Sequence, residues 1–196
     1  MQTFKIGQEH IEIALASLKK TKELIYYAVQ LTDAVQRGAI RPEHFEKCLI
    51  VPEPHSKNQF CIELDWTQYP EIFKQTADDA QVNIASYAIL ICKETYSNVL
   101  WIDEEKNADL YAAQMILKLV RDAMGHMRAE SKGFAAPYWD INKKHRRILE
   151  IKELGIIFDA ESVHGKQFKF SHLGGLTNFL KILNYLIKDL HERLLV

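Results

Sequence analysis

The sequence predicts a mainly α-helical fold, a helical bundle with a small β-hairpin inserted before the last helix. Apolar residues recur at spacings of three and four over four long stretches, which is the period of an amphipathic helix. Short alternating stretches with glycine turns between residues 148 and 170 indicate the hairpin. No internal repeat or linker divides the 196 residues. We therefore expect a single domain over residues 1–196.

The composition favours a globular protein without a membrane span. Apolar residues make up 47% of the chain, and the formal net charge is −1, so any nucleic-acid contact must be a local basic patch. The three cysteines are far apart in sequence and predict neither a disulfide framework nor a zinc knuckle. The first residues lack an apolar signal core, and no apolar run reaches the roughly 18 residues of a membrane span. We expect a cytoplasmic protein.

The first half of the chain contains two predicted long helices. The first runs from Gln8 to Arg37, because an apolar stripe with helical period ends at Gly38. A short helix follows with Pro42 in its first turn, and residues 60–66 alternate weakly enough to be a strand or a packed loop. The second long helix is predicted from Pro70 to Asn98.

The central helix is predicted from Asn107 to Met127. Its apolar stripe consists of Leu110, Ala113, Leu117, Val120, Met124 and Met127. This continuous stripe predicts a helix that buries one face in the core, and the rest of the bundle is expected to pack around it.

The segments after the central helix are shorter. Residues 127–142 look irregular, whereas residues 148–151 and 155–158 have the pattern of two short strands. Residues 161–165 have turn chemistry, and residues 167–170 alternate like a further strand. A final helix is predicted from the glycine pair at 174–175 to about Arg193.

The end of the central helix carries the candidate catalytic residues Arg121, Asp122 and His126. Asp122 and His126 are four residues apart and share a helix face, so the carboxylate is expected to accept a hydrogen bond from the imidazole. Gly125 weakens the helix just before His126. A guanidinium beside a titratable imidazole suits phosphodiester chemistry, in which Arg121 holds the phosphate and His126 moves protons. No metal-ligand spacing is present, so neither a metal nor a cofactor is expected.

The same residues also suit a purely structural role. A cation and an imidazole near a helix C-terminus are favourable there by roughly 0.3–1 kcal/mol each. Short Arg-to-His spacings also arise by chance, as they do at Arg37 and His44, which straddle a predicted loop. The residues alone leave both readings open.

A locally basic segment follows the motif. Its candidate RNA-binding residues are Arg128, Lys132, Tyr138, Trp139, Lys143, Lys144, Arg146 and Arg147. Cations interleaved with aromatic rings are typical of surfaces that bind phosphates and stack bases. The alternative is a solvated loop whose aromatic residues attach it to the core.

The segment Arg121-Asp122-Ala123-Met124-Gly125-His126 resembles the signature of the HEPN superfamily, the helical domains of prokaryotic toxins and antiviral RNases. In that signature an Arg, a polar residue and, four positions later, a His end a core helix. The resemblance continues through Trp139-Asp140, Arg146–Ile151, Ile157–Ala160 and the glycine pair before the last helix, and covers the chain from about Asn107 onward. Asp122 stands where Asn is the commoner residue.

The resemblance implies a homodimer that brings two Arg–His motifs to one cleft and cleaves RNA without a metal. The RNA 2′-hydroxyl would attack the adjacent phosphorus and leave a 2′,3′-cyclic phosphate and a 5′-hydroxyl. Such proteins act in defence or toxin–antitoxin systems. Other members of the superfamily lack activity and bind RNA or a protein partner, such as an antitoxin or a nucleotidyltransferase. A helical structural protein with an accidental Arg–His pair is the remaining alternative.

Overall fold

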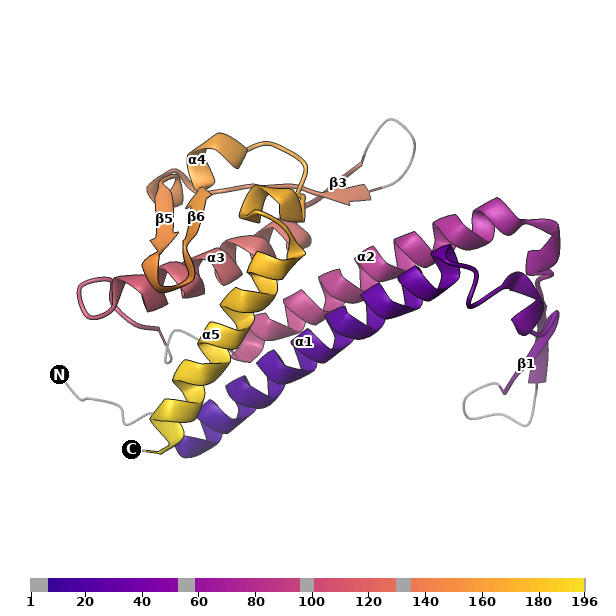
Figure 1. Ribbon diagram of the computed structural model, residues 1–196, viewed down its shortest axis with the longest axis horizontal. Helices are drawn as coiled ribbons and strands as arrows, with labels where there is room; N and C mark the ends of the chain where they lie inside the picture. Colours follow the sequence, from indigo (N-terminus) through magenta and orange to yellow (C-terminus); the bar gives the residue numbers. More distant parts are fainter. Residues whose placement is uncertain (1–6, 53–58, 96–100, 130–134, 196) are drawn as a thin grey trace. The chain divides into compact units, whose positions relative to one another are not determined.

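The computed structural model describes residues 7–52, 59–95, 101–129 and 135–195. Contacts within the chain divide it into two compact units, residues 1–23 with 86–196 and residues 24–85. The elements are mainly helical, as predicted, and a two-stranded hairpin precedes the last helix. Figure 1 shows the elements in chain order.

The two long helices of the first half are confirmed. Helix α1 spans Gln8–Gln36 and α2 spans Pro70–Thr95; the predicted extension of α2 to Asn98 lies outside the described residues. Gly38 has a φ of 73° directly after α1, a left-handed conformation that suits glycine and ends a helix. In the larger unit, the buried Thr21 hydroxyl of α1 donates to the carbonyl oxygen of Ala88 on α2 at 2.9 Å.

Residues 24–85 contain a hairpin between the two helices. A short 3₁₀ helix, Pro42–His44, leads to β1 (Cys48–Pro52), which pairs antiparallel with β2 (Gln59–Glu63), and a 3₁₀ turn at Trp66–Gln68 precedes α2. The open choice between strand and loop for residues 60–66 is thereby settled as a strand to Glu63. Cys61 is disulfide-bonded, which the wide spacing of the cysteines did not predict; the weak alternation did not reveal the hairpin that carries this residue.

Helix α3, Ala108–Gly125, is the predicted central helix. Its first turn is capped by the Asn107 side chain, which accepts a hydrogen bond from the Leu110 amide at 2.9 Å. The apolar stripe from Leu110 to Met124 is buried. The observed helix ends two residues before the predicted end, because His126 leaves the helical conformation with φ −99° and ψ 77°.

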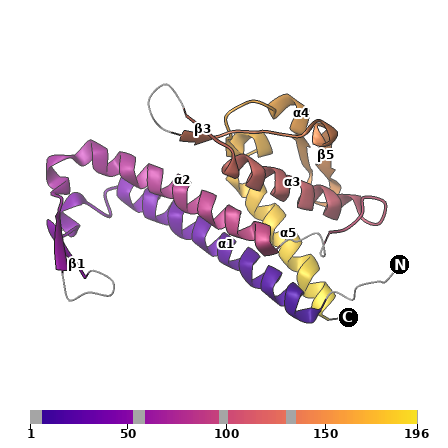
Figure 2. The ribbon, with the colours of Figure 1, turned by 180° about the vertical axis from the view of Figure 1, so that it is seen from behind.

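Strand β5 (Ile148–Ile151) pairs antiparallel with β6 (Ile156–Asp159), which confirms the predicted hairpin. Figures 1 and 2 both show this hairpin lying on one side of α3, and β5 contacts that helix. Ile148 and Ile157 are exposed while Leu149, Ile151, Ile156 and Phe158 are buried, so the strand alternation separates a solvent face from a core face.

Three predictions in this region differ from the structure. Residues 127–142, expected to be irregular, contain a short antiparallel pair, β3 (Met127–Ala129) with β4 (Ala135–Pro137). The predicted turn at 161–165 contains one helical turn, α4 (Ala160–Val163). Residues 167–170 form no strand, because Gln167 makes only one bridge, to Tyr138, before a 3₁₀ helix at Phe170–Leu173.

The last helix, α5, spans Leu176–Leu194, close to the predicted end at Arg193. Its buried residues are Phe179, Ile182, Leu183, Leu186 and Leu190, and α5 contacts α3. Packing of two amphipathic helices face to face buries both apolar stripes. No helix in the described ranges combines the length and the apolar character that crossing a membrane requires.

Candidate functional site

The candidate site begins where α3 ends. The His126 amide donates to the carbonyl oxygens of Asp122 at 3.0 Å and Ala123 at 3.3 Å, and these bonds close the last turn. The next residues run into β3, and the amide of Tyr138 donates to the His126 carbonyl at 3.1 Å. The backbone of His126 is therefore fixed from both sides, while its side chain is exposed.

The Asp122 carboxylate pairs with cations on its own helix. Its oxygens lie 2.8 Å from Nη2 of Arg121 and 3.5 Å from Nζ of Lys118. Among the contacts of the described residues, these pairs replace the predicted hydrogen bond from His126 to Asp122. The Arg121 and Asp122 side chains are only 19% and 24% exposed, so the pair is partly shielded from water.

A cleft of about 320 Å³ opens at this end of α3. It is lined by Lys118, Leu119, Asp122, His126, Asp140, Asn142, Lys144 and His145. Two of the three predicted catalytic residues, Asp122 and His126, thus face one cleft together with a second imidazole. Arg121 is not among the lining residues and reaches the cleft only through its ion pair with Asp122.

A short 3₁₀ helix, Lys143–His145, supplies the second imidazole. Asn142 caps it by accepting a hydrogen bond from the Lys144 amide at 3.2 Å. The pKa of His145 is lowered from its usual value of 6.5, first by burial and then by the positive charges of Lys118, Lys144 and Arg147, while Asp122 acts in the opposite direction. His145 is therefore uncharged at neutral pH and able to accept a proton.

The basic segment divides into structural and cleft-facing cations. Arg146 is structural, because its Nε donates to the Ile141 carbonyl at 2.9 Å and its Nη2 lies 2.7 Å from Nε2 of His164. Arg147 is paired with Glu104 at 2.7 Å. Lys143 is exposed, whereas Lys144 lines the cleft. Of these four predicted RNA-binding cations, the structure thus brings only Lys144 to the site.

The predicted role of Trp139 in base stacking is wrong for this fold. Its ring is fully buried and packs against Phe158 and Phe168 with centroid distances of 5.1 and 5.0 Å. Its Nε1 donates to Nδ1 of His172 at 2.9 Å. No face of the indole is left for a base. Tyr138 is partly exposed and bridges to Gln167.

Two further predicted RNA-binding residues are not placed by the structure. Lys132 lies outside the described residues, and the side chain of Arg128 does too, although its backbone belongs to β3.

The residues that sequence reasoning missed are Lys118, Asp140 and His145. Lys118 lies one helical turn before Asp122, and the four-residue spacing was a usable signal for their contact. His145 sits inside the basic run 143–147, but nothing local indicates that this run folds back onto the end of α3. Among the described residues, no group of three or more His, Cys, Asp or Glu side chains is arranged to hold a metal ion.

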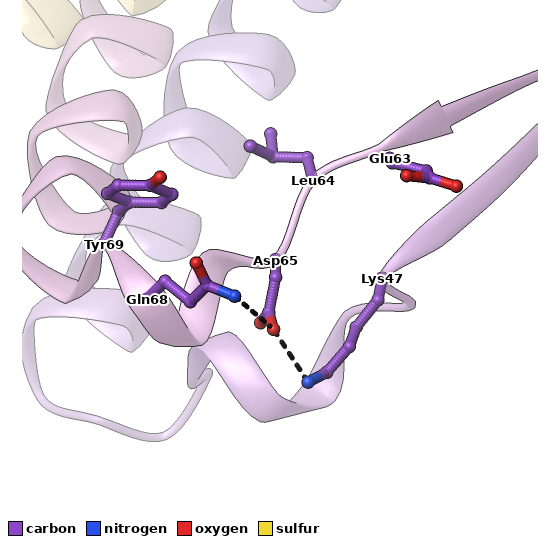
Figure 3. A pocket seen from close by; sticks show the side chains of 6 residues that line it. All are labelled: Lys47, Glu63, Leu64, Asp65, Gln68 and Tyr69. Atoms are coloured by element: carbon purple, nitrogen blue, oxygen red, sulfur yellow. Dashed lines mark hydrogen bonds and ion pairs between the residues drawn. The ribbon is translucent and has the colours of Figure 1, made fainter.

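A second hollow, of about 430 Å³, lies within residues 24–85 (Figure 3). Its carboxylate, Asp65, is already engaged by Lys47 at 2.7 Å and by the side chains of Thr67 and Gln68. The ammonium of Lys47 and these hydrogen bonds hold the pKa of Asp65 well below its usual range. Asp65 also caps the 3₁₀ turn at Trp66–Gln68, so its arrangement is that of a structural cap.

Comparisons of the chain with known protein families, with curated proteins and with solved structures found no significant match.

Proposed function

We propose that the protein is a HEPN-type endoribonuclease that cleaves RNA without a metal at the cleft beside the end of α3. The observation that supports this most strongly is the cleft itself, which is lined by two imidazoles, His126 and His145, and two ammonium groups, Lys118 and Lys144. A pair of imidazoles can supply both the base and the acid of a phosphodiester cleavage.

The lowered pKa of His145 suits it to the role of base. In the proposed reaction, His145 accepts the proton of the RNA 2′-hydroxyl, whose oxygen attacks the adjacent phosphorus. The bond between phosphorus and the 5′-oxygen breaks, and His126 donates the proton that the leaving oxygen needs. The products are a 2′,3′-cyclic phosphate and a 5′-hydroxyl. Lys118 and Lys144 stabilise the negative charge that develops on the nonbridging oxygens.

Arg121 and Asp122 act through position in this proposal. Asp122 lines the cleft and pairs with Arg121 at 2.8 Å. The guanidinium therefore offsets the negative charge that the carboxylate brings to the cleft. A homodimer, as the resemblance to HEPN proteins implies, would place the clefts and the Arg121 side chains of two subunits together. A role in defence or in a toxin–antitoxin system belongs to the same proposal.

The second candidate function is a non-catalytic HEPN module that binds RNA or a protein partner, such as an antitoxin or a nucleotidyltransferase. The ion pairs of Asp122 with Arg121 and Lys118 favour it, because the carboxylate partly neutralises Lys118, one of the two cations that the first candidate offers to a phosphate. In this case the end of α3 is a salt-bridged helix terminus.

Cleavage of a labelled RNA pool in EDTA distinguishes the two candidates. His126→Ala and His145→Asn should each lower the rate by about 10²–10⁴-fold, the usual contribution of one acid or base group. His191→Ala is the matched control, since His191 is exposed on α5 and lies outside the cleft. Cleavage that survives both cleft substitutions would contradict the roles of His126 and His145, whereas a wild-type protein that binds RNA without cutting it would favour the second candidate.

A further inference from the structure

Another hollow, distinct from the one beside Asp65, adjoins the cleft at the end of α3. Its volume is about 390 Å³, and it is lined by Trp101, Tyr111, Met115, Lys118, Lys144 and His145. The last three residues also line the cleft at the end of α3. The two hollows therefore share one wall, formed by two ammonium groups and one imidazole. On one side of this wall lie the aromatic rings, and on the other lie the imidazole of His126 and the carboxylates of Asp122 and Asp140.

Three contacts hold the aromatic side of this hollow in place. The Ile102 amide donates to the buried side chain of Gln114 on α3 at 3.0 Å, which anchors the residue next to Trp101. The Trp101 and Tyr111 rings meet edge to face, with centroids 5.8 Å apart and planes at 90°. Arg147 covers the Tyr111 ring at 5.3 Å. Trp101 is partly exposed, so its ring is a fixed aromatic surface that solvent can reach.

The charges around this hollow select its ligand. No carboxylate lines it, whereas Lys118 and Lys144 border it. Beyond Tyr111, a further hollow is lined by Asp103, Glu104, Glu105 and Lys106. Its three carboxylates against one ammonium group disfavour a phosphate there. The hollow beside Trp101 thus combines aromatic side chains with two cations. An unpaired nucleotide has the matching parts, a base that stacks and a phosphate that accepts hydrogen bonds from ammonium groups.

We propose that this hollow is a base-binding subsite, in which Trp101 stacks on one unpaired base of single-stranded RNA while Lys118 and Lys144 bind the adjoining phosphate. The substrate class rests on the proposed function, since the same phosphate is the one that enters the cleft of His126 and His145. Paired RNA is excluded because its bases stack on one another. The subsite accepts any base, since every base has a face that can stack.

Binding without cleavage tests the subsite separately from the activity. The probe is a fluorescein-labelled 2′-O-methyl RNA pentamer, which lacks the attacking hydroxyl, and the readout is its anisotropy with the full-length protein. Trp101→Ala should weaken binding about 5- to 150-fold, the loss expected for one base–aromatic stack. Trp101→Phe should retain most of the affinity. Tyr87→Ala is the control, because Tyr87 is 65% exposed and lies outside the hollow.

An abasic pentamer of the same charge separates base stacking from anion binding. It should bind wild type and Trp101→Ala equally and more weakly than the base-bearing probe binds wild type. If Trp101→Ala is not folded by circular dichroism, Trp101→Leu takes its place, since leucine fills the volume without an aromatic face.

The subsite is overturned if base-bearing and abasic probes bind wild type alike, or if a folded Trp101 variant without a ring binds as tightly as wild type. RNA cleavage observed together with either result would leave the proposed function standing and remove the subsite alone. Trp101-dependent binding without any RNA cleavage would support the subsite and remove only the nuclease.

Discussion

Replacing Trp139 with phenylalanine should destabilise the fold without weakening RNA binding by the folded protein. The indole is 0% exposed and lies between Phe158 and Phe168. Phenylalanine keeps most of these ring contacts and removes the Nε1 donor that binds His172 at 2.9 Å. The substitution therefore separates the structural role of this residue from the RNA-binding role that its sequence context predicts.

The expected loss of unfolding free energy has two parts. A lost hydrogen bond in a part-buried site costs about 0.5–1.5 kcal/mol. The volume that the indole filled and the phenyl ring leaves empty costs roughly another 1–2 kcal/mol. We expect a total of about 2–3 kcal/mol for Trp139→Phe, and roughly 3–5 kcal/mol for Trp139→Ala.

Urea denaturation followed by far-ultraviolet circular dichroism measures this difference through the transition midpoint. RNA affinity is measured in the absence of urea, where Trp139→Phe remains folded. A stability within about 0.5 kcal/mol of wild type, a typical effect of a surface substitution, would refute the buried position of the ring. A folded Trp139→Phe with lost RNA affinity would restore the stacking role.

Three further predictions follow from the same contacts. Burial lowers the pKa of His172 from its usual 6.5, so as the pH falls His172 takes up a proton in the unfolded chain at a higher pH than in the folded chain. The unfolding free energy should therefore fall as pH drops below about 6.5, and His172→Gln, measured by urea titration at several pH values, should reduce that fall. The pKa of His145 is lowered, so the cleavage rate, plotted against pH, should fall on the acidic side only below pH 6.5. Lys144→Gln removes one cause of the lowered pKa and should move this fall in rate to higher pH. Gly174→Ala should lower thermal stability more than Gly155→Ala. Both have positive φ, which costs about 1–2 kcal/mol for alanine, but a Cβ at Gly174 would meet Nδ2 of Asn178 at 2.5 Å, while none lies near Gly155.

The helices and the β5–β6 hairpin could be predicted from sequence because their signals are local. The apolar stripe of α3 has one period from Leu110 to Met124, and its cap, Asn107, stands directly before it. The hairpin alternates, and its chain reversal contains Gly155 in a left-handed conformation. In these segments the local preference of each residue type, for a helix, a cap, a strand or a turn, matches the position that the residue has in the fold.

The contacts of the candidate site could be predicted only in part. Helical spacing brings Asp122 toward His126, but the carboxylate binds Arg121, its neighbour in sequence. Neighbouring residues point in different directions on a helix, and the long, flexible side chain of Arg121 is what allows this contact. His145 reaches the cleft because residues 140–145 fold against α3, which no local pattern encodes.

The aromatic residues show the same limit most clearly. Trp139 lies among cations in the sequence and is buried by Phe158 and Phe168 from later segments. Trp101, which the sequence pattern assigns to no helix or strand, is the ring that stays partly exposed beside Lys118. Burial depends on the partners that the fold brings, so composition alone could not show that Trp139 is buried.

The position of cleavage in a chimaeric RNA tests the central claim most directly. A labelled single-stranded RNA carries one 2′-O-methyl nucleotide, which lacks the attacking hydroxyl, and the fragments formed in EDTA are identified by mass spectrometry. Attack by the 2′-hydroxyl predicts fragments that end in 2′,3′-cyclic phosphate at every linkage cut, with no cut after the methylated nucleotide. Cleavage after that nucleotide, or fragments that end in a 3′-hydroxyl, would contradict the proposed chemistry of His126 and His145.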